Sequence, residues 1–189
     1  RGLKRFIFLS SIKVMGEKSH TPFKETDAPH PVDAYGRSKL EAETLLKEMA
    51  QHYGVEWVIV RPPLVYGPKA GGNIARMLSL IQKGFPLPLA SLKNQRSMVH
   101  IETLCDFLIS CLKPEAANQL FHIADKDYTT AEFIRQLAKD YHLHPKLFPC
   151  PAWLLKVAGT MLGKRQEIDR LCDSLQVDCT HARQLLQPK

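Results

Sequence analysis

The sequence lacks the patterns that mark several common classes of protein. It has no Cys-x-x-Cys pair, and its cysteines are odd in number and stand far apart, at Cys105, Cys111, Cys150, Cys172 and Cys179. Both observations argue against a disulfide framework and against a zinc site, so we expect no metal and a cytoplasmic location. No apolar run approaches the ~18 residues that a membrane helix needs, and we therefore expect no membrane partner.

Positive charge predominates in the sequence but is not concentrated. The 189 residues include 26 lysines and arginines against 19 aspartates and glutamates, which gives a formal net charge of +7. The basic residues are scattered from Lys4 to Lys189 with no run of five or more, and aromatic residues do not alternate with them. A nucleic-acid surface needs such a cluster, so we expect no nucleic acid among the partners.

The beginning of the sequence is unlike that of a complete protein. It has no initiator methionine, and no apolar stretch of signal-peptide length follows its first basic residues. The stretch "RGLKRFIFLSS" reads as the end of a helix that runs into a strand. We therefore expect a fragment of a longer parent protein.

The first third of the chain has the pattern of a β-α-β unit. Residues 5–10 and 55–61 are short apolar runs rich in aromatic or β-branched residues, as in buried parallel strands. Between them, a turn-rich polar loop over 16–33 leads into a helix that Asp33 caps and Gly54 ends. The apolar positions of this helix follow an amphipathic period, at Ala42, Leu45, Leu46, Met49 and Tyr53. The two strands should be parallel, with a right-handed crossover.

The remainder of the chain alternates helices with short strands. The pattern predicts a mostly helical tail from Pro151, a strand over 119–124, and helices over 73–83, 102–112 and 130–141. Thr129, with Glu132 three residues later, has the spacing of a capping box before the last of these three helices. Cys105 and Cys111 fall in an apolar helical stretch and are expected in the core.

The first predicted helix carries a tyrosine and a lysine four residues apart, in "DAYGRSK". Tyr35 and Lys39 share one face of that helix. A free tyrosine titrates near ~10, but an ammonium ~5 Å away at an effective dielectric of ~20 favours the phenolate by roughly 3 kcal/mol. Such a pair is a sensible general base for taking a proton from an alcohol. The same spacing is also common on helix surfaces that have no catalytic role.

Two serines stand at the carboxyl end of the preceding strand, where ligands of open α/β sheets bind. The hydroxyl of Ser11 is placed to hydrogen-bond a substrate alcohol and to relay its proton to the phenolate. For Ser10 the simpler interpretation is that it ends the strand.

Four segments follow one another in a characteristic order and spacing, namely "FIFLSSIKVMGE", "DAYGRSKLEAE", "VIVRPPLVYGP" and "RSMVHIETL". In this arrangement the chain, over nearly its whole length, resembles the extended short-chain dehydrogenase/reductase family. The resemblance is greatest to its NAD-dependent nucleotide-sugar epimerase/dehydratase group, which includes UDP-glucose 4-epimerase and enzymes of polysaccharide biosynthesis. It implies an enzyme, an isomerase or oxidoreductase, that moves hydride between a sugar carbon and NAD or NADP.

The resemblance implies roles for the residues already singled out. Tyr35 matches the catalytic base, and Lys39 matches the lysine that holds the cofactor ribose and tunes the tyrosine. Ser11, five residues before Gly16, matches the catalytic serine or threonine. Pro63 matches a position whose backbone contacts the nicotinamide end of the cofactor.

The resemblance also implies a nucleotide-sugar substrate and three residues that bind it. Asn73 and Arg96 match positions that bind the diphosphate, and Arg165 matches a second phosphate-binding arginine. An arginine suits this task because its guanidinium meets phosphate oxygens with two parallel hydrogen bonds.

The chain departs from the family pattern at several positions. The dehydratases of the group carry Asp-Glu where this chain has Ile12 and Lys13, which argues against a sugar dehydratase. Leu64 stands where many epimerases have a substrate-binding asparagine, Met15 replaces a common tyrosine, and Ser97 replaces an aspartate. The choice between epimerase, nucleotide-sugar dehydrogenase and 4-keto reductase therefore stays open.

The glycine-rich turn that holds the cofactor pyrophosphate in this family has no counterpart in the sequence. Ten glycines are present, but none forms G-x-x-G-x-x-G or G-x-G-x-x-G. We expect an α/β fold in which residues 1–67 form the C-terminal part of a doubly wound, Rossmann-type parallel sheet. Residues 68–189 should form mainly a smaller α/β substrate-binding lobe, with some segments returning to the sheet.

Two expectations about the isolated chain follow. Because the adenosine half of the cofactor site is not in the sequence, the chain alone should be inactive, and its alternative role is that of a non-catalytic nucleotide-sugar-binding module. A homodimer is left open for the parent protein.

Overall fold

The computed structural model of the chain describes residues 2–186 and divides it into two compact units. Unit 1 comprises Arg1–Val65, Ser97–Lys126 and Gln176–Lys189, and unit 2 comprises Tyr66–Arg96 and Asp127–Leu175. Each unit is therefore built from segments that are far apart in the sequence. Within residues 2–186, no helix combines the length and the apolar character needed to cross a bilayer.

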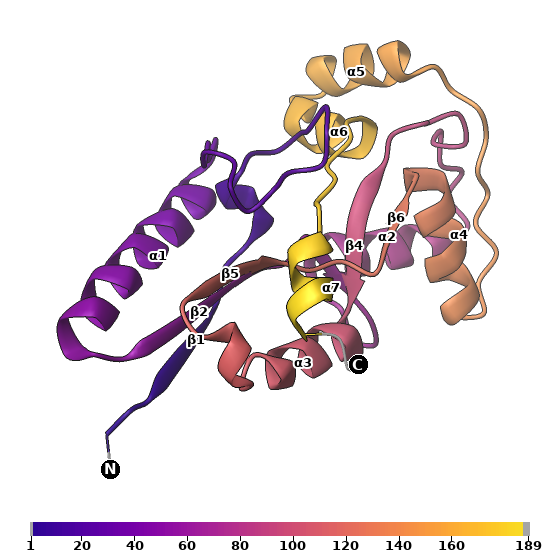
Figure 1. Cartoon of the computed structure of the whole chain (residues 1–189). Coiled ribbons are helices and arrows are strands. Elements are labelled where there is room, and N and C mark those ends of the chain that lie inside the picture. Colours follow the sequence, from indigo (N-terminus) through magenta and orange to yellow (C-terminus); the bar gives the residue numbers. More distant parts are fainter. Residues whose placement is uncertain (1, 187–189) are drawn as a thin grey trace. The chain divides into compact units, whose positions relative to one another are not determined.

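Unit 1 is built on a three-stranded sheet in the order β1-β2-β5. All three strands are parallel, and their bounds are β1 (Arg5–Leu9), β2 (Glu56–Arg61) and β5 (Gln119–His122). The register pairs Leu9 with Val60 and Arg61 with His122, so the carboxyl ends of the three strands lie at the same edge (Figure 1). The parallel β-α-β unit predicted from the sequence is confirmed.

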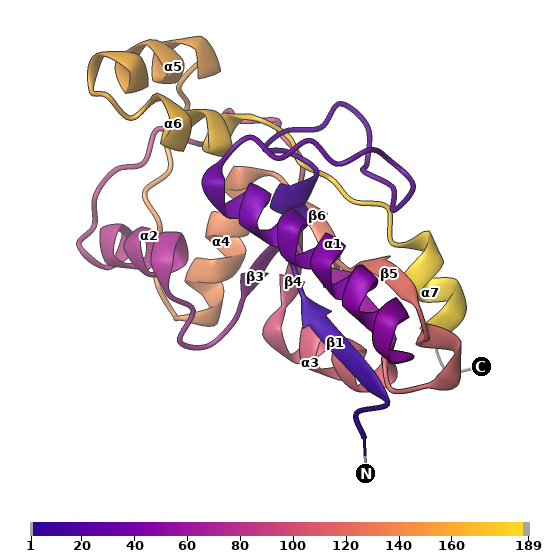
Figure 2. The same cartoon turned by 90° about the vertical axis from the view of Figure 1, so that its left-hand side faces the viewer.

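Helix α1 (Ala34–Tyr53) begins and ends where the sequence predicts. Asp33 accepts a hydrogen bond from the N–H of Gly36 at 2.7 Å, and Gly54 ends the helix in the left-handed conformation, with φ of 64°. The helix runs along one face of the sheet (Figures 1 and 2). Both ends are fixed by local capping, which explains why the sequence alone located them.

The face that α1 turns toward the sheet differs from the predicted one. Its buried residues are Gly36, Glu43 and Ala50, spaced seven apart. Three of the apolar residues expected to face the core are exposed to solvent instead, Leu45 at 58%, Met49 at 43% and Tyr53 at 66%. That part of the prediction was wrong, because the helix approaches the sheet with small residues and one charged side chain.

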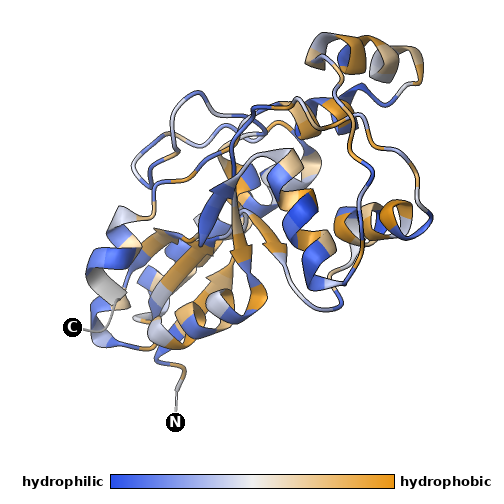
Figure 3. Cartoon of the chain, turned by 90° about the vertical axis from the view of Figure 1, so that its right-hand side faces the viewer, coloured by the Kyte–Doolittle hydropathy of each residue, from blue (hydrophilic) through white to orange (hydrophobic). Residues whose placement is uncertain are grey.

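The opposite face of the sheet carries the apolar core of unit 1. Helices α3 (Ile101–Ser110) and α7 (Thr180–Leu186), with the short 3-10 turn η2 (Pro114–Ala116), pack there against β2 and β5. Figure 3 shows the apolar character of the strands. Phe107 of α3 meets Phe121 of β5 edge to face, with ring centres 5.5 Å apart. Cys111 is buried as expected, but Cys105 is exposed, because the buried positions of α3 are Leu104 and Phe107.

A second three-stranded sheet has the order β3-β4-β6. Its strands are β3 (Leu64–Tyr66), β4 (Arg96–His100) and β6 (Lys126–Tyr128). Unit 2 adds four helices, α2 (Gly72–Gln82), α4 (Thr130–Asp140), α5 (Ala152–Met161) and α6 (Arg165–Cys172). Helix α4 starts with the predicted capping box, in which Thr129 and Glu132 each bond the other's backbone N–H.

Candidate functional site

The segments that follow β1 and β2 run side by side at the carboxyl edge of the first sheet. The backbone N–H of Ile12 donates to the carbonyl of Pro62 at 3.0 Å. Ser11 and Pro63 are the chain neighbours of this hydrogen-bonded pair, so the structure brings both to the same strand ends. Pro63 is buried there, and Ser11 is half-buried.

Ser11 caps the short 3-10 turn η1 (Ile12–Val14) in an extended conformation, with φ of −158° and ψ of 148°. Its Oγ accepts a hydrogen bond from the backbone N–H of Lys13 at 3.3 Å. This bond uses a lone pair of the hydroxyl and not its proton. The hydroxyl of Ser11 therefore keeps a proton that it can donate to another oxygen.

Tyr35 and Lys39 lie in the first turns of α1, next to this edge. Tyr35 is 50% exposed, and the Nζ of Lys39 lies 5.9 Å from the centre of its ring. The same Nζ donates to the carbonyl of Leu9 at 3.1 Å and lies 4.9 Å from the ring centre of Phe8. Lys39 thus reaches the end of the strand that Ser11 follows, and the three predicted catalytic residues belong to adjoining segments of unit 1.

A buried ion pair lies beneath this edge and was not predicted from the sequence. The guanidinium of Arg61, at the end of β2, donates to both carboxylate oxygens of Glu43 on α1, at 2.9 and 2.5 Å. The two side chains are 3% and 2% exposed. Ser10 donates its hydroxyl proton to the same carboxylate at 2.5 Å, and Arg61 also donates to the sulfur of Met15 at 3.0 Å.

Ser10 therefore does more than end a strand, which corrects the simpler interpretation. Through the carboxylate of Glu43, it links β1 to α1 and, through Arg61, to β2. The elements that carry Ser11, Tyr35 and Pro63 are tied together by this one buried network.

His122, the last residue of β5, is fully buried beside this network. It pairs with Arg61 in the sheet register, and its Nδ1 lies 3.1 Å from the carbonyl of Phe23. Nδ1 donates in this contact, and within the part of the chain that the structure describes Nε2 has no hydrogen-bond partner. Burial lowers the pKa of His122 below its ordinary value of 6.5, against the opposing effect of the Glu25 carboxylate.

We expect this histidine to make folding sensitive to mild acid. Below pH 6.5 the unfolded chain binds a proton that the folded chain does not, so stability is lost as the pH falls from 6.5 toward the lower pKa of the folded state. For one proton the slope cannot exceed about 1.4 kcal/mol per pH unit. Urea unfolding at pH 7.5, 6.5 and 5.5 should show this loss in the wild type and less of it in His122→Asn. The exposed His20→Asn should behave as the wild type, and equal losses in all three proteins would contradict the assignment.

The three residues expected to bind substrate phosphates lie in unit 2, in different surroundings. Asn73 is exposed in the first turn of α2, and Arg165 is exposed at the start of α6, with its Nε 3.7 Å from a carboxylate oxygen of Asp169. Arg96 is half-buried, and its Nη1 donates to the carbonyls of Arg170 and Asp173 at 2.9 and 3.0 Å. Arg96 thus also braces the backbone at the end of α6.

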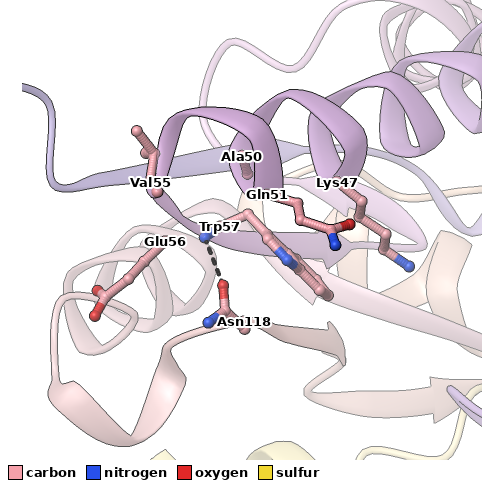
Figure 4. A pocket seen from close by; sticks show the side chains of 8 residues that line it. Lys47, Ala50, Gln51, Val55, Glu56, Trp57 and Asn118 are labelled. Atoms are coloured by element: carbon pink, nitrogen blue, oxygen red, sulfur yellow. Dashed lines mark hydrogen bonds between the residues drawn. The ribbon is translucent and has the colours of Figure 1, made fainter.

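A surface pocket of unit 1 lies at the other end of the sheet, where β2 begins and α1 ends. It has a volume of about 490 Å³, and Lys47, Gln51, Trp57 and Asn118 are among the residues that line it (Figure 4). The Nζ of Lys47 lies 4.9 Å from the ring centre of Trp57. The side-chain Oδ1 of Asn118 accepts a hydrogen bond from the backbone N–H of Trp57 at 3.2 Å. None of the predicted site residues lines this pocket. The catalytic candidates lie at the opposite end of the sheet, at its carboxyl edge.

Comparison with known proteins identifies the family of the chain. The sequence model of the NAD dependent epimerase/dehydratase family matches residues 1–124, which include the whole β1-α1-β2 unit and β5. The chain belongs to this family. The epimerase/dehydratase resemblance inferred from the four sequence segments is thereby confirmed.

Among individual epimerase/dehydratase relatives, a UDP-glucose 4-epimerase of Vibrio cholerae is 44% identical, over 98% of this chain and 58% of its own length. An Escherichia coli O157:H7 protein, the N-acetyl-alpha-D-glucosaminyl-diphospho-ditrans,octacis-undecaprenol 4-epimerase, is 28% identical over 95% of this chain and 59% of its own length. The chain therefore spans less than three fifths of the length of these relatives.

Solved structures of the same kind share the fold. A UDP-glucuronic acid 4-epimerase from Bacillus cereus in complex with NAD superposes with a TM-score of 0.73 at 21% identity, over 98% of this chain and 56% of that one. A UDP-glucose 4-epimerase from Thermotoga maritima with UDP-glucose gives a TM-score of 0.72 at 23% identity, over 100% and 59%. The expected α/β fold with a Rossmann-type parallel sheet is confirmed.

Proposed function

We propose that this chain supplies the proton-transfer residues of an NAD-dependent nucleotide-sugar epimerase. The observation that carries the proposal is the 44% identity to a UDP-glucose 4-epimerase over 98% of the chain. The placement of Ser11, Tyr35 and Lys39 on adjoining segments at the carboxyl edge of a parallel sheet supports it, because ligands of such sheets bind at that edge.

In the proposed reaction, Tyr35 takes the proton of the sugar hydroxyl whose carbon is oxidised. Its half-exposed side chain is open to a substrate that arrives from solvent. The ammonium of Lys39, with its Nζ 5.9 Å from the centre of the Tyr35 ring, places a positive charge beside the phenol. The hydroxyl of Ser11 donates to the sugar oxygen and orients it toward Tyr35.

The side chains at this edge also fit the nicotinamide ribose of the cofactor. The ammonium of Lys39 donates hydrogen bonds and the phenol oxygen of Tyr35 accepts them, so both suit ribose hydroxyls, and the backbone of Pro63 lies at the same strand ends. NAD, when bound, supplies the acceptor and then the donor of the hydride. Lys39, Tyr35 and Pro63 would hold its nicotinamide end.

For the substrate, we propose that Arg165 and Asn73 bind the diphosphate of the nucleotide sugar, with Arg96 as a third ligand. The exposed guanidinium of Arg165 has the fork geometry that suits phosphate oxygens. Besides this proposed contact with phosphate, Arg96 donates hydrogen bonds to two backbone carbonyls at the end of α6 and so keeps that backbone in place.

We further propose that these residues work with a glycine-rich dinucleotide-binding segment that the 189 residues do not contain. A chimera tests both proposals. In it, this chain replaces the part of the Vibrio cholerae relative that it matches, so that the rest of the relative supplies the remaining length.

The chimera is expected to convert UDP-glucose into UDP-galactose without net formation of NADH, and the 189 residues alone are expected not to. Chromatography of the sugar nucleotides measures the conversion, and absorbance at 340 nm measures any NADH that forms. Accumulation of NADH would indicate a dehydrogenase instead of an epimerase. A folded chimera that binds NAD but turns over no nucleotide sugar would contradict the proposed function, and turnover by the 189 residues alone would contradict the need for a further segment.

A further inference from the structure

Lys13 joins the turn after β1 to the first turn of α1 through three of its own groups. Its backbone N–H donates to the Oγ of Ser11 at 3.3 Å, and its Nζ lies 2.7 Å from Oδ2 of Asp33. Its carbonyl oxygen would lie only 2.6 Å from a Cβ added to Gly36, so only glycine allows α1 to approach this closely. One residue thus contacts both the Ser11 turn and the start of the helix that carries Tyr35.

Asp33 uses its two carboxylate oxygens for different tasks. Oδ1 accepts from the N–H of Gly36 at 2.7 Å and caps α1, while Oδ2 accepts from Lys13. The hydrogen bond from Lys13 holds the pKa of Asp33 at about 2, below its ordinary value of 3.8. The carboxylate is therefore ionised at neutral pH, so the ion pair and the helix cap are present together.

Glu17 completes this cluster of charged side chains. Its Oε1 lies 2.9 Å from the Nζ of Lys13, and the side chains of Lys13, Glu17 and Asp33 are 29%, 22% and 30% exposed. The same Nζ lies 5.8 Å from the centre of the Tyr35 ring. Because two carboxylates offset the charge of Lys13, its effect on the neighbouring phenol is mainly geometric.

We propose that Lys13 is a positioning residue that fixes the Ser11 hydroxyl and the Tyr35 phenol relative to each other. The inference rests on the function proposed above for those two residues. A substrate alcohol must reach both groups at once, so a loosened connection lowers the rate of proton transfer more than it lowers affinity for the nucleotide sugar. At the position where the dehydratases of the family carry an acid, this chain thus has a lysine that connects η1 to α1.

Fluorine NMR of the 189-residue chain tests the positioning without any need for turnover. The chain has five tyrosines, and after labelling with 3-fluorotyrosine the signal missing from Tyr35→Phe identifies the one at the site. Lys13→Met and Asp33→Asn should both shift or broaden this signal, and asparagine keeps the helix cap. Lys13→Arg should keep the signal at its wild-type position, and so should Lys18→Met, at an exposed lysine in the loop that follows η1.

Kinetics of the chimera give the second measurement. Lys13→Met should lower kcat on the order of 10- to 100-fold while KM for UDP-glucose changes less than about threefold, and Lys13→Arg should recover most of the rate. A wild-type Tyr35 signal in folded Lys13→Met overturns the proposal, as does a signal that moves in Lys13→Met but not in Asp33→Asn. The spectra still decide the matter if the chimera does not epimerise UDP-glucose, so failure of the proposed function is distinguishable from failure of this inference.

Discussion

Glu43→Ala is expected to lower the free energy of unfolding by about 3–5 kcal/mol. The substitution leaves the guanidinium of Arg61, which is 3% exposed, buried without its carboxylate, and it also removes the acceptor of the Ser10 hydroxyl. An uncompensated buried charge costs far more than a lost surface contact. Urea unfolding followed by circular dichroism at pH 7.5 measures the loss.

The matched control is Glu41→Ala, at an exposed glutamate on the same helix, for which we expect a change within about 0.5 kcal/mol. A double variant, Glu43→Leu with Arg61→Met, should recover much of the lost stability, because it removes both buried charges at once. Equal costs for Glu43→Ala and Glu41→Ala would show that the ion pair does not hold α1 to the sheet.

The same ion pair explains why the sequence predicted the bounds of α1 but not its buried face. Asp33 and Gly54 act on the backbone within a few residues, so their effect can be read from the sequence. The orientation of the helix depends on what it packs against. Apolar periodicity favoured the side with Leu45 and Met49, whereas the sheet accepts the side with Glu43 because Arg61 is there to receive it.

In the candidate site, too, local features could be predicted from the sequence and long-range contacts could not. The Tyr35 and Lys39 pair follows from helical spacing, and the place of Ser11 follows from the position of its strand end, so both could be predicted from the sequence. The contact between Lys13 and Asp33 joins residues 20 apart across a loop, and no local pattern indicates it. In the sequence, Lys13 stands out only as a departure from the family pattern, and Asp33 only as a helix cap.

Buried charges and long-range backbone contacts are the features that sequence reasoning missed most consistently. His122 falls within the strand predicted over 119–124, and only the structure shows that burial at the end of β5 lowers its pKa. A useful signal was present, since Arg61 and His122 each stand at or near the end of a short apolar run. A charged or titratable residue at the carboxyl end of a buried parallel strand needs a partner, and in unit 1 that partner comes from α1 or from the 16–33 loop.

Tyr35→Phe is expected to lower kcat by about 10²- to 10⁴-fold in the active chimera, the range that a general base contributes. The substitution removes a single oxygen from a side chain that is 50% exposed, so folding should be unaffected. Affinity for UDP-glucose should survive, because the proposed phosphate ligands lie elsewhere in the chain. Turnover gives kcat, and titration calorimetry gives the affinity.

Tyr53→Phe is the matched control, because Tyr53 lies on the same helix and is 66% exposed, but stands at its far end. It should retain the wild-type kcat and the wild-type unfolding midpoint. If Tyr35→Phe also turns over at the wild-type rate, Tyr35 is not the base, and the exposed phenol beside Lys39 serves binding alone. If it loses affinity while kcat stays at the wild-type value, the hydroxyl contributes equally to ground state and transition state, which is the signature of uniform binding and not of proton transfer.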